Sequence, residues 1–182
     1  MIYRQRKPNR LKNFNYSSNG YYFVTICAKN RECLFGEIID GKMVLNEHGK
    51  IIEKYWEEIP NHYQNILLDE FIIMPNHIHG IVVISKHKQK IIKNVGTEQC
   101  SVPTRFGLLS KIIKSFKEII IKIFHIEFGN YRFKWQRSFY DHIIRNEESV
   151  QKIREYIRNN AKNWNKDRNN PKNVILKRQG LF

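Results

Sequence analysis

Short runs of apolar, aromatic and β-branched residues predict β-strands in the first half of the chain. Two of these runs flank Asp40-Gly41, a pair that tolerates the positive φ angles of a tight hairpin. Two others are separated by Pro75-Asn76, which favours a turn. The expected strands cover residues 22–27, 34–39, 42–45, 67–74 and 77–84.

Apolar residues recur at helical spacing in three other segments. The expected helices run from after Asn46, a favourable N-cap, to Pro60, from residue 108 to 124, and from residue 150 to 164. Residues 131–139 are aromatic and basic, and we expect a short strand there. Because strands and helices interleave with hairpin-type connections, the pattern predicts an α+β fold in which helices cover an antiparallel sheet.

Composition adds a strong positive charge to this picture. The 182 residues include 32 Lys+Arg and 17 Asp+Glu, for a net charge of +15. With 41% hydrophobic residues the chain has enough apolar material for one folded domain, which we place at residues 21–165, between a basic N-terminal arm (1–20) and a polar C-terminal tail (166–182).

Several classes of protein are disfavoured. No apolar run approaches the roughly 18 residues of a membrane span, and the N-terminus lacks the apolar stretch of a secretory signal. We therefore expect a cytoplasmic, nucleoid-associated protein. Cys27, Cys33 and Cys100 form neither an even set nor a Cys-x-x-Cys pair, which argues against a disulfide framework, a thiolate zinc site and redox chemistry.

His77-Ile78-His79 is the sharpest local feature. On a strand, residues i and i+2 point to the same face, so the two imidazoles can bind one ion while Ile78 points to the other face. Gly80, next along the strand, leaves room for a close approach of backbone or ligand. The alternative is two ordinary histidines at the start of a strand.

Tyr156 and Asn160 lie one helical turn apart, beside the apolar stripe of the last expected helix. A tyrosine oxygen next to a metal-bound phosphate can attack phosphorus and hold the product covalently. An amide oxygen can ligate the metal, and nitrogen and oxygen ligands with room for phosphate suit Mg²⁺ or Mn²⁺. The alternative for a tyrosine beside an apolar helical face is ordinary core packing.

Three ordered motifs, Met74-Pro75-Asn76-His77-Ile78-His79-Gly80, the segment 135–146 and Tyr156-Ile157-Arg158-Asn159-Asn160, give the chain a family resemblance. It resembles the REP-associated tyrosine transposases, which belong to the single-tyrosine transposases of the HUH (His-hydrophobic-His) superfamily. The resemblance runs from about Arg4 to Trp164, and it departs from the usual Asn-Pro at Ala161. It implies a ferredoxin-like domain at residues 21–165 with helices on one face of the sheet.

By the same resemblance, His77, His79 and Asn160 hold a divalent cation, Mg²⁺ or Mn²⁺, and Tyr156 is the nucleophile. The implied reaction cleaves and rejoins hairpin-forming, palindromic single-stranded DNA through a 5′-phosphotyrosine. Tyr140 is the rival nucleophile, but Ile144 stands where its i+4 amide would be needed. His142 is a candidate for positioning phosphate or accepting a proton, and a homodimer is a further candidate, because related transposases form dimers.

Basic residues fall in clusters that suit a phosphate backbone. The candidate DNA-binding residues are Arg4, Arg6, Lys7, Lys111, Lys114, Arg132, Lys134 and Arg137, with a lysine-rich loop at residues 86–93. Three aromatic residues between the last of these, Tyr131, Phe133 and Trp135, are candidates for stacking on unpaired bases. The alternative for each cluster is a solvated face.

Two other functions remain open. A domesticated nucleic-acid-binding module would keep the fold and charge without cleaving, and it would need neither the histidines nor Tyr156. A metal-dependent phosphohydrolase would need carboxylates near the histidines. Asp69 and Glu70 are close in sequence, but only one of them can share the histidines' face.

Overall fold

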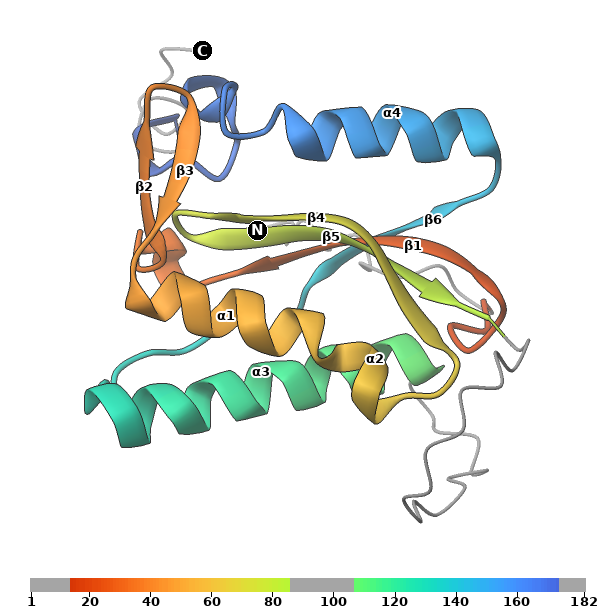
Figure 1. The fold of residues 1–182 in the computed structure, drawn as a ribbon, viewed down its shortest axis with the longest axis horizontal. Helices are drawn as coiled ribbons and strands as arrows, with labels where there is room; N and C mark the ends of the chain where they lie inside the picture. Colours follow the sequence, from red (N-terminus) through yellow and green to blue (C-terminus); the bar gives the residue numbers. More distant parts are fainter. Residues whose placement is uncertain (1–13, 86–106, 174–182) are drawn as a thin grey trace, which may run out of the picture.

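Four strands form the central sheet in the order β4-β5-β1-β6, and each neighbouring pair is antiparallel. The computed structural model describes residues 14–85 and 107–173 (Figure 1). The sheet strands are β1 (Gly20–Cys27), β4 (Ile66–Met74), β5 (His77–Ile84) and β6 (Tyr140–Ile144). A separate hairpin consists of β2 (Gly36–Ile39) and β3 (Lys42–Leu45).

The main helices are α1 (Glu47–Glu57), α2 (Ile59–His62), α3 (Gly107–Phe128) and α4 (Glu147–Arg158). Short 3₁₀ turns follow β1 (Lys29–Arg31) and α4 (Trp164–Lys166). Since α1 connects β1 to β4 and α3 connects β5 to β6, the order of the four sheet strands is that of a ferredoxin-like domain. The expected α+β class is confirmed.

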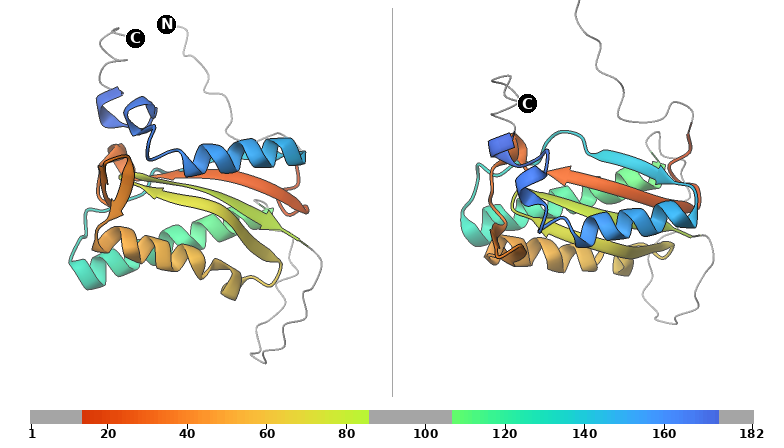
Figure 2. Two further views of the ribbon diagram at one scale, coloured as in Figure 1. Left: turned by 45° about the horizontal axis from the view of Figure 1, so that its top comes forward. Right: turned by 90° about the horizontal axis from the view of Figure 1, so that it is seen from above.

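The helices occupy both faces of the sheet, whereas we expected them on one face. Helices α1, α2 and α3 lie on one side and α4 lies alone on the other (Figures 1 and 2). The reason is the alternation along the strands, which leaves a second apolar strip containing Phe23 and Ile81 on the far face. Val150 and Ile157 of α4 pack on this strip.

Local signals set the ends of several elements. The Asn46 side chain accepts a hydrogen bond from Gly49 N (3.0 Å) at the start of α1, and Asn146 does the same from Ser149 N (2.8 Å) at the start of α4. In the β2–β3 turn, Asp40 and Gly41 have φ angles of 49° and 71°, as a tight hairpin requires. Helix α4 ends at Arg158, so the expected continuation to Trp164 is wrong.

The expected strand at residues 131–139 is also wrong. Trp135 forms only an isolated bridge with Ala28, and the strand lies later, at β6. Phe133 and Trp135 are buried in the main core, where Phe133 packs against Phe124 with ring centroids 4.5 Å apart. Their rings are therefore not available for stacking on bases.

Some expectations concern residues that the structure does not describe. Arg4, Arg6, Lys7, Cys100 and the lysine-rich loop at 86–93 lie outside the described residues. Among the described cysteines, Cys27 and Cys33 are unpaired, and burial raises the pKa of Cys27 to about 11. In the described part of the chain, no helix combines the length and the hydropathy that a membrane crossing requires.

Candidate active site

The two histidines of β5 meet on the α4 face of the sheet. His77 Nε2 and His79 Nε2 are 3.0 Å apart, and both residues are buried. Ile78 points to the opposite face, where it joins the main core, as the strand alternation predicted.

Asn76 fixes the orientation of the His77 ring. Its Nδ2 donates to the carbonyl oxygens of Arg31 and Asn169, both at 2.9 Å, so its Oδ1 is the atom that faces His77 Nδ1 at 2.8 Å. An amide oxygen can only accept, which means that His77 Nδ1 carries the proton. The Nε2 of the neutral ring therefore presents a lone pair to the site.

His79 is held in a similar way. Its Nδ1 lies 2.9 Å from Thr25 Oγ1, and its ring stacks on Phe23 with centroids 5.3 Å apart. Hydrogen bonds of this kind at the outer nitrogen orient histidine ligands in metal sites. Both imidazoles thus direct Nε2 to one point.

Asp167 brings a carboxylate to the same point. Its Oδ2 lies 3.9 Å from His77 Nε2 and 4.0 Å from His79 Nε2, while its Oδ1 accepts a hydrogen bond from Asn169 N. The ligand atoms of His77, His79 and Asp167 all lie within 4.8 Å of one another, so the three residues are placed to hold a metal ion.

The sequence reasoning missed Asp167, which it assigned to the polar tail. One signal was available, because Asp167 is the single acidic residue after Glu155. No periodicity marks it, however, since it follows the 3₁₀ turn at Trp164–Lys166 and lies in an irregular segment. Trp164 of that turn stacks on His77, with ring centroids 6.1 Å apart.

Tyr156 reaches the histidines from α4. Its Oη lies 3.2 Å from His79 Nε2, and its ring packs edge-on against Phe23 and His79. The residue is 47% exposed, so its hydroxyl is accessible to a large substrate while one side of the ring is fixed.

Asn160 completes the cluster just beyond the end of α4. It is 2% exposed, and its Oδ1 is a buried acceptor without a hydrogen-bond partner among the described residues. An unpartnered buried amide oxygen is costly unless a cation or donor meets it. Together with two oriented imidazoles and a carboxylate, this donor set fits a divalent cation.

Burial controls the protonation of the site. It lowers the pKa of His77 well below the usual value, with His79 as the next cause, and it lowers the pKa of His79 to about 3, assisted by the charge of Arg168. Both imidazoles are therefore neutral at physiological pH, which is the form that binds metals. Burial and Asp167 raise the pKa of Tyr156, opposed by a hydrogen bond from Asn160 and by Arg168.

Gly80 serves a different purpose from the one we expected. A Cβ at this position would lie 2.6 Å from Trp56 Cζ2 and 3.2 Å from Phe71 Cβ. The close approach is therefore made by the indole of Trp56, on the face opposite the histidines. Gly80 contributes to packing under the sheet.

Tyr140 and His142 share the face of the histidines, because Tyr140 pairs with Thr25 and His142 with Phe23 in the β1–β6 register. Tyr140 is 42% exposed and its ring lies under the Arg168 guanidinium, 5.3 Å from the centroid. In the described part of the chain, neither Tyr140 nor His142 hydrogen-bonds to His77 or His79.

The other carboxylates considered from the sequence do not reach the histidines. Asp69 accepts two hydrogen bonds from Arg154, at 2.9 and 2.6 Å, and Glu70 pairs with Arg158 at 2.7 Å. Both pairs tie the edge strand β4 to α4. Among the described residues, Asp167 is the carboxylate that reaches the histidines.

The basic residues expected to bind DNA are dispersed. Lys111 and Lys114 are exposed on α3, so the sheet separates them from Tyr156 (Figure 1). Exposed side chains on the segment between α3 and β6 include Arg132, Lys134 and Arg137. Their contact with DNA stays a prediction.

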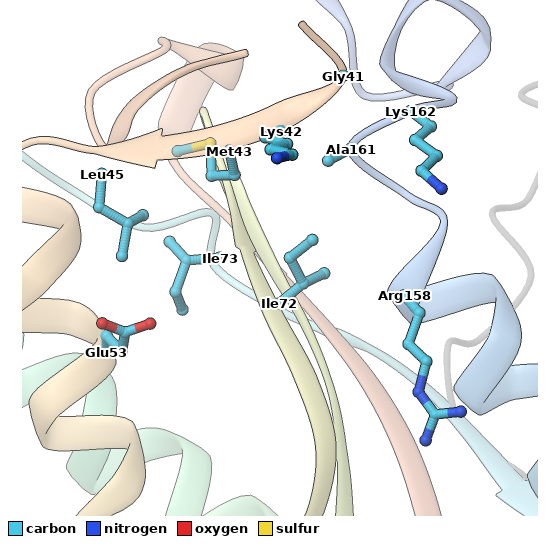
Figure 3. Close-up of a pocket in the computed structure, with 10 residues that line it drawn as sticks. All are labelled: Gly41, Lys42, Met43, Leu45, Glu53, Ile72, Ile73, Arg158, Ala161 and Lys162. Carbon is cyan, nitrogen blue, oxygen red and sulfur yellow. The ribbon is translucent and has the colours of Figure 1, made fainter. Parts of the chain in front are cut away.

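A cavity of about 360 Å³ opens beside the site, between the β2–β3 hairpin, β4 and the end of α4 (Figure 3). Met43, Ile72 and Ile73 form apolar walls. Three cationic side chains, Lys42, Arg158 and Lys162, also line it, together with the carboxylate of Glu53. Arg158 is paired with Glu70 at 2.7 Å.

Comparison with known proteins agrees with this fold. No family model matches the chain. An uncharacterized protein of Haemophilus influenzae is 40% identical over 172 residues, covering 89% of this chain and 91% of the relative. The solved structure of a REP-associated tyrosine transposase bound to a REP hairpin has a TM-score of 0.51 at 16% identity, covering 83% of this chain and 72% of that one. This chain therefore belongs to the family of the Haemophilus influenzae protein and has the fold of a REP-associated tyrosine transposase.

Proposed function

We propose that this protein is a single-tyrosine transposase that cleaves and rejoins hairpin-forming single-stranded DNA, with Tyr156 as the nucleophile. The observation that carries the proposal is the 3.2 Å approach of Tyr156 Oη to His79 Nε2, beside a donor set for a divalent cation. A nucleic-acid-binding module needs neither a buried pair of oriented histidines nor a tyrosine hydroxyl beside them.

The residues that would hold the cation are His77, His79, Asn160 and Asp167. When bound, an Mg²⁺ or Mn²⁺ ion supplies Lewis-acid stabilisation of the charge that builds on the phosphate. The raised pKa of Tyr156 keeps its hydroxyl protonated at neutral pH. The low pKa of His79 makes it a poor acceptor for the phenol proton, which leaves water and His142, on the same face of the sheet, as the candidate acceptors.

Tyr156 Oη supplies the electron pair of the new O–P bond. The P–O3′ bond breaks, its electron pair stays on O3′, and that oxygen takes up a proton to become a 3′-hydroxyl. One phosphodiester replaces another, so attack by a 3′-hydroxyl on the phosphotyrosine reverses the step and joins strands without an external energy source.

The test uses hairpin oligonucleotides with a single-stranded flank, labelled at either end and incubated with Mg²⁺ or Mn²⁺. We expect a 3′ label to move with the denatured protein and a 5′ label to be released on a fragment ending in a 3′-hydroxyl. Tyr156→Phe loses the adduct and Tyr140→Phe keeps it. The reverse pattern would make Tyr140 the nucleophile, and binding without cleavage would indicate the domesticated module.

A metal-dependent phosphohydrolase is the second candidate, because Asp167 supplies the carboxylate that such an enzyme needs near its histidines. In a hydrolase, water attacks the phosphate and Tyr156 has no covalent role. Release of a 5′-phosphate without any protein adduct, at a rate unchanged in Tyr156→Phe, would favour this function over the transposase.

A further inference from the structure

Arg168 is a cation on the face of the sheet that carries the proposed nucleophile. Its guanidinium lies over the Tyr140 ring, 5.3 Å from the centroid, and a cation over an aromatic face is attracted by the ring quadrupole. Tyr140 in turn packs edge-on against Phe23, the residue that also contacts His79 and Tyr156. The contacts of Arg168 with Tyr140, and of Tyr140 with Phe23, thus position the guanidinium charge.

The charge acts on the whole site. The positive charge of Arg168 lowers the pKa values of His77, His79 and Tyr156. The residue is exposed, and in the described part of the chain it forms no ion pair with a carboxylate. A positive charge that is held in place and not neutralised by the protein is available to an anionic ligand.

The segment that carries Arg168 explains how the charge is oriented. Asp167, the preceding residue, has extended backbone angles (φ −66°, ψ 134°) and directs its carboxylate to the histidines. Asn169, the following residue, is held by Asn76 through its carbonyl oxygen. Arg168 lies between these two fixed neighbours.

We propose that Arg168 binds the non-bridging oxygens of the phosphate that Tyr156 attacks, and that the Tyr140 ring positions the guanidinium. The inference rests on the proposed function. A planar guanidinium can donate two parallel hydrogen bonds to a phosphate, and such contacts gain strength as negative charge builds in the transition state. Tyr140 then has a positioning role that needs its ring and not its hydroxyl.

The test compares Arg168→Ala with Lys166→Ala, which removes an exposed cation from the same segment. Single-turnover adduct formation is measured at saturating DNA, together with the Kd for the hairpin and the rise in Tm on adding Mn²⁺. We expect Arg168→Ala to slow adduct formation about 10²- to 10³-fold, as for loss of a donor to a developing charge. Arg168→Lys recovers part of the rate, and Lys166→Ala stays within about threefold of wild type, as for removal of an isolated surface charge.

Tyr140 supplies an internal check. Tyr140→Leu removes the ring and is expected to lower the saturated rate about fivefold, since a cation–π contact at an exposed site is worth roughly one kcal/mol and about 1.4 kcal/mol corresponds to a tenfold change in rate. Tyr140→Phe keeps the ring and therefore keeps most of the rate. A larger loss in Tyr140→Phe than in Tyr140→Leu would overturn the positioning role.

Other outcomes overturn the assignment of Arg168. It fails if the variant changes only Kd, since the residue then adds affinity alone. It also fails if the Mn²⁺-induced rise in Tm disappears with the rate, since Arg168 then acts by holding Asp167. A wild-type protein that forms no adduct overturns the proposed function and this inference together, whereas a wild-type adduct formed equally fast by Arg168→Ala overturns this inference alone.

Discussion

The two faces of the central sheet are built from alternate residues of the same strands, yet they carry different kinds of side chain. In β1, Tyr22, Val24 and Ile26 point to the helices α1 and α3, whereas Phe23 and Thr25 point to α4. In β5 the same alternation separates Ile78 from the two histidines.

The α1–α3 face contains a large, continuous apolar cluster, with Trp56, Tyr22 and Phe35 among its fully buried members. The α4 face has a small apolar cluster and a group of buried polar residues, including His77, His79, Asn160 and Asp167. Burying polar groups lowers stability unless partners meet them. The difference indicates that one face supplies folding energy, which allows the other to retain groups for chemistry.

The largest effect on stability is expected from Trp56→Ala on the apolar face. Trp56 is fully buried, and removing such a side chain costs about 3–5 kcal/mol through lost burial and the cavity left behind. Urea denaturation, analysed at constant m-value, measures the change. The variant should have a lower Tm than wild type, but a divalent metal ion should still raise that Tm. Loss of the metal-induced rise would mean that packing on the apolar face is needed for metal binding on the other face.

The next effect belongs to the polar face. Mn²⁺ at a hundred times its Kd should stabilise the protein by about 2.7 kcal/mol, because it binds only the folded state. His77→Ala and Asn160→Ala should lose most of this gain in thermal unfolding with and without the ion. Lys50→Ala, on an exposed ion pair of α1, is the matched control that keeps it. An equal gain in all variants would place the ion elsewhere.

Gly80→Ala should destabilise the protein by about 1–3 kcal/mol, as overpacking does in a well-packed core. The added Cβ would meet Trp56 and Phe71 on the apolar face, not the histidines. The double variant Gly80→Ala/Trp56→Ala should recover part of the combined loss, since removal of the indole creates space. If the loss of stability in the double variant equalled the sum of the two single losses, the contact with Trp56 would not be the reason that position 80 requires glycine.

The smallest effect concerns the contact between the edge strand and α4. The hydrogen bonds from Arg154 lower the pKa of Asp69. A carboxyl whose folded-state pKa is depressed contributes stability above its unfolded pKa, near 3.9, and loses it as the pH falls through the folded value. Asp69→Asn should therefore cost about 1–2 kcal/mol at pH 7 and nothing at low pH. A variant with the same acid sensitivity as wild type would contradict this.

Local signals predicted most of the elements. The Asp40-Gly41 turn, the Asn46 cap and the alternation around Ile78 each depend on residues close in sequence, and each is present. The juxtaposition of the two histidines follows from strand geometry alone. The approach of Tyr156 to His79 did not follow from spacing, and we expected it because the chain resembles a transposase family.

Long-range packing explains the failures. Asp167 and His77 are far apart in sequence, and the segment around Asp167 has no period that would direct a side chain to the sheet. The aromatic residues at 133 and 135 have strand-like composition, but their rings fill the main core beside Phe35 and Phe124. Composition cannot distinguish a strand from an irregular segment whose side chains complete a core.

The hydrogen bonds of Asn76 connect His77, in the proposed metal site, with the C-terminal segment around Asn169. Its amide oxygen orients His77 toward the proposed cation site, and its amide nitrogen holds the Asn169 carbonyl and with it the C-terminal segment. Thermodynamic linkage makes such a connection reciprocal: the factor by which docking of this segment tightens metal binding equals the factor by which the metal tightens docking. Truncating the chain before residue 164 would therefore weaken the metal site by more than the loss of the Asp167 carboxylate.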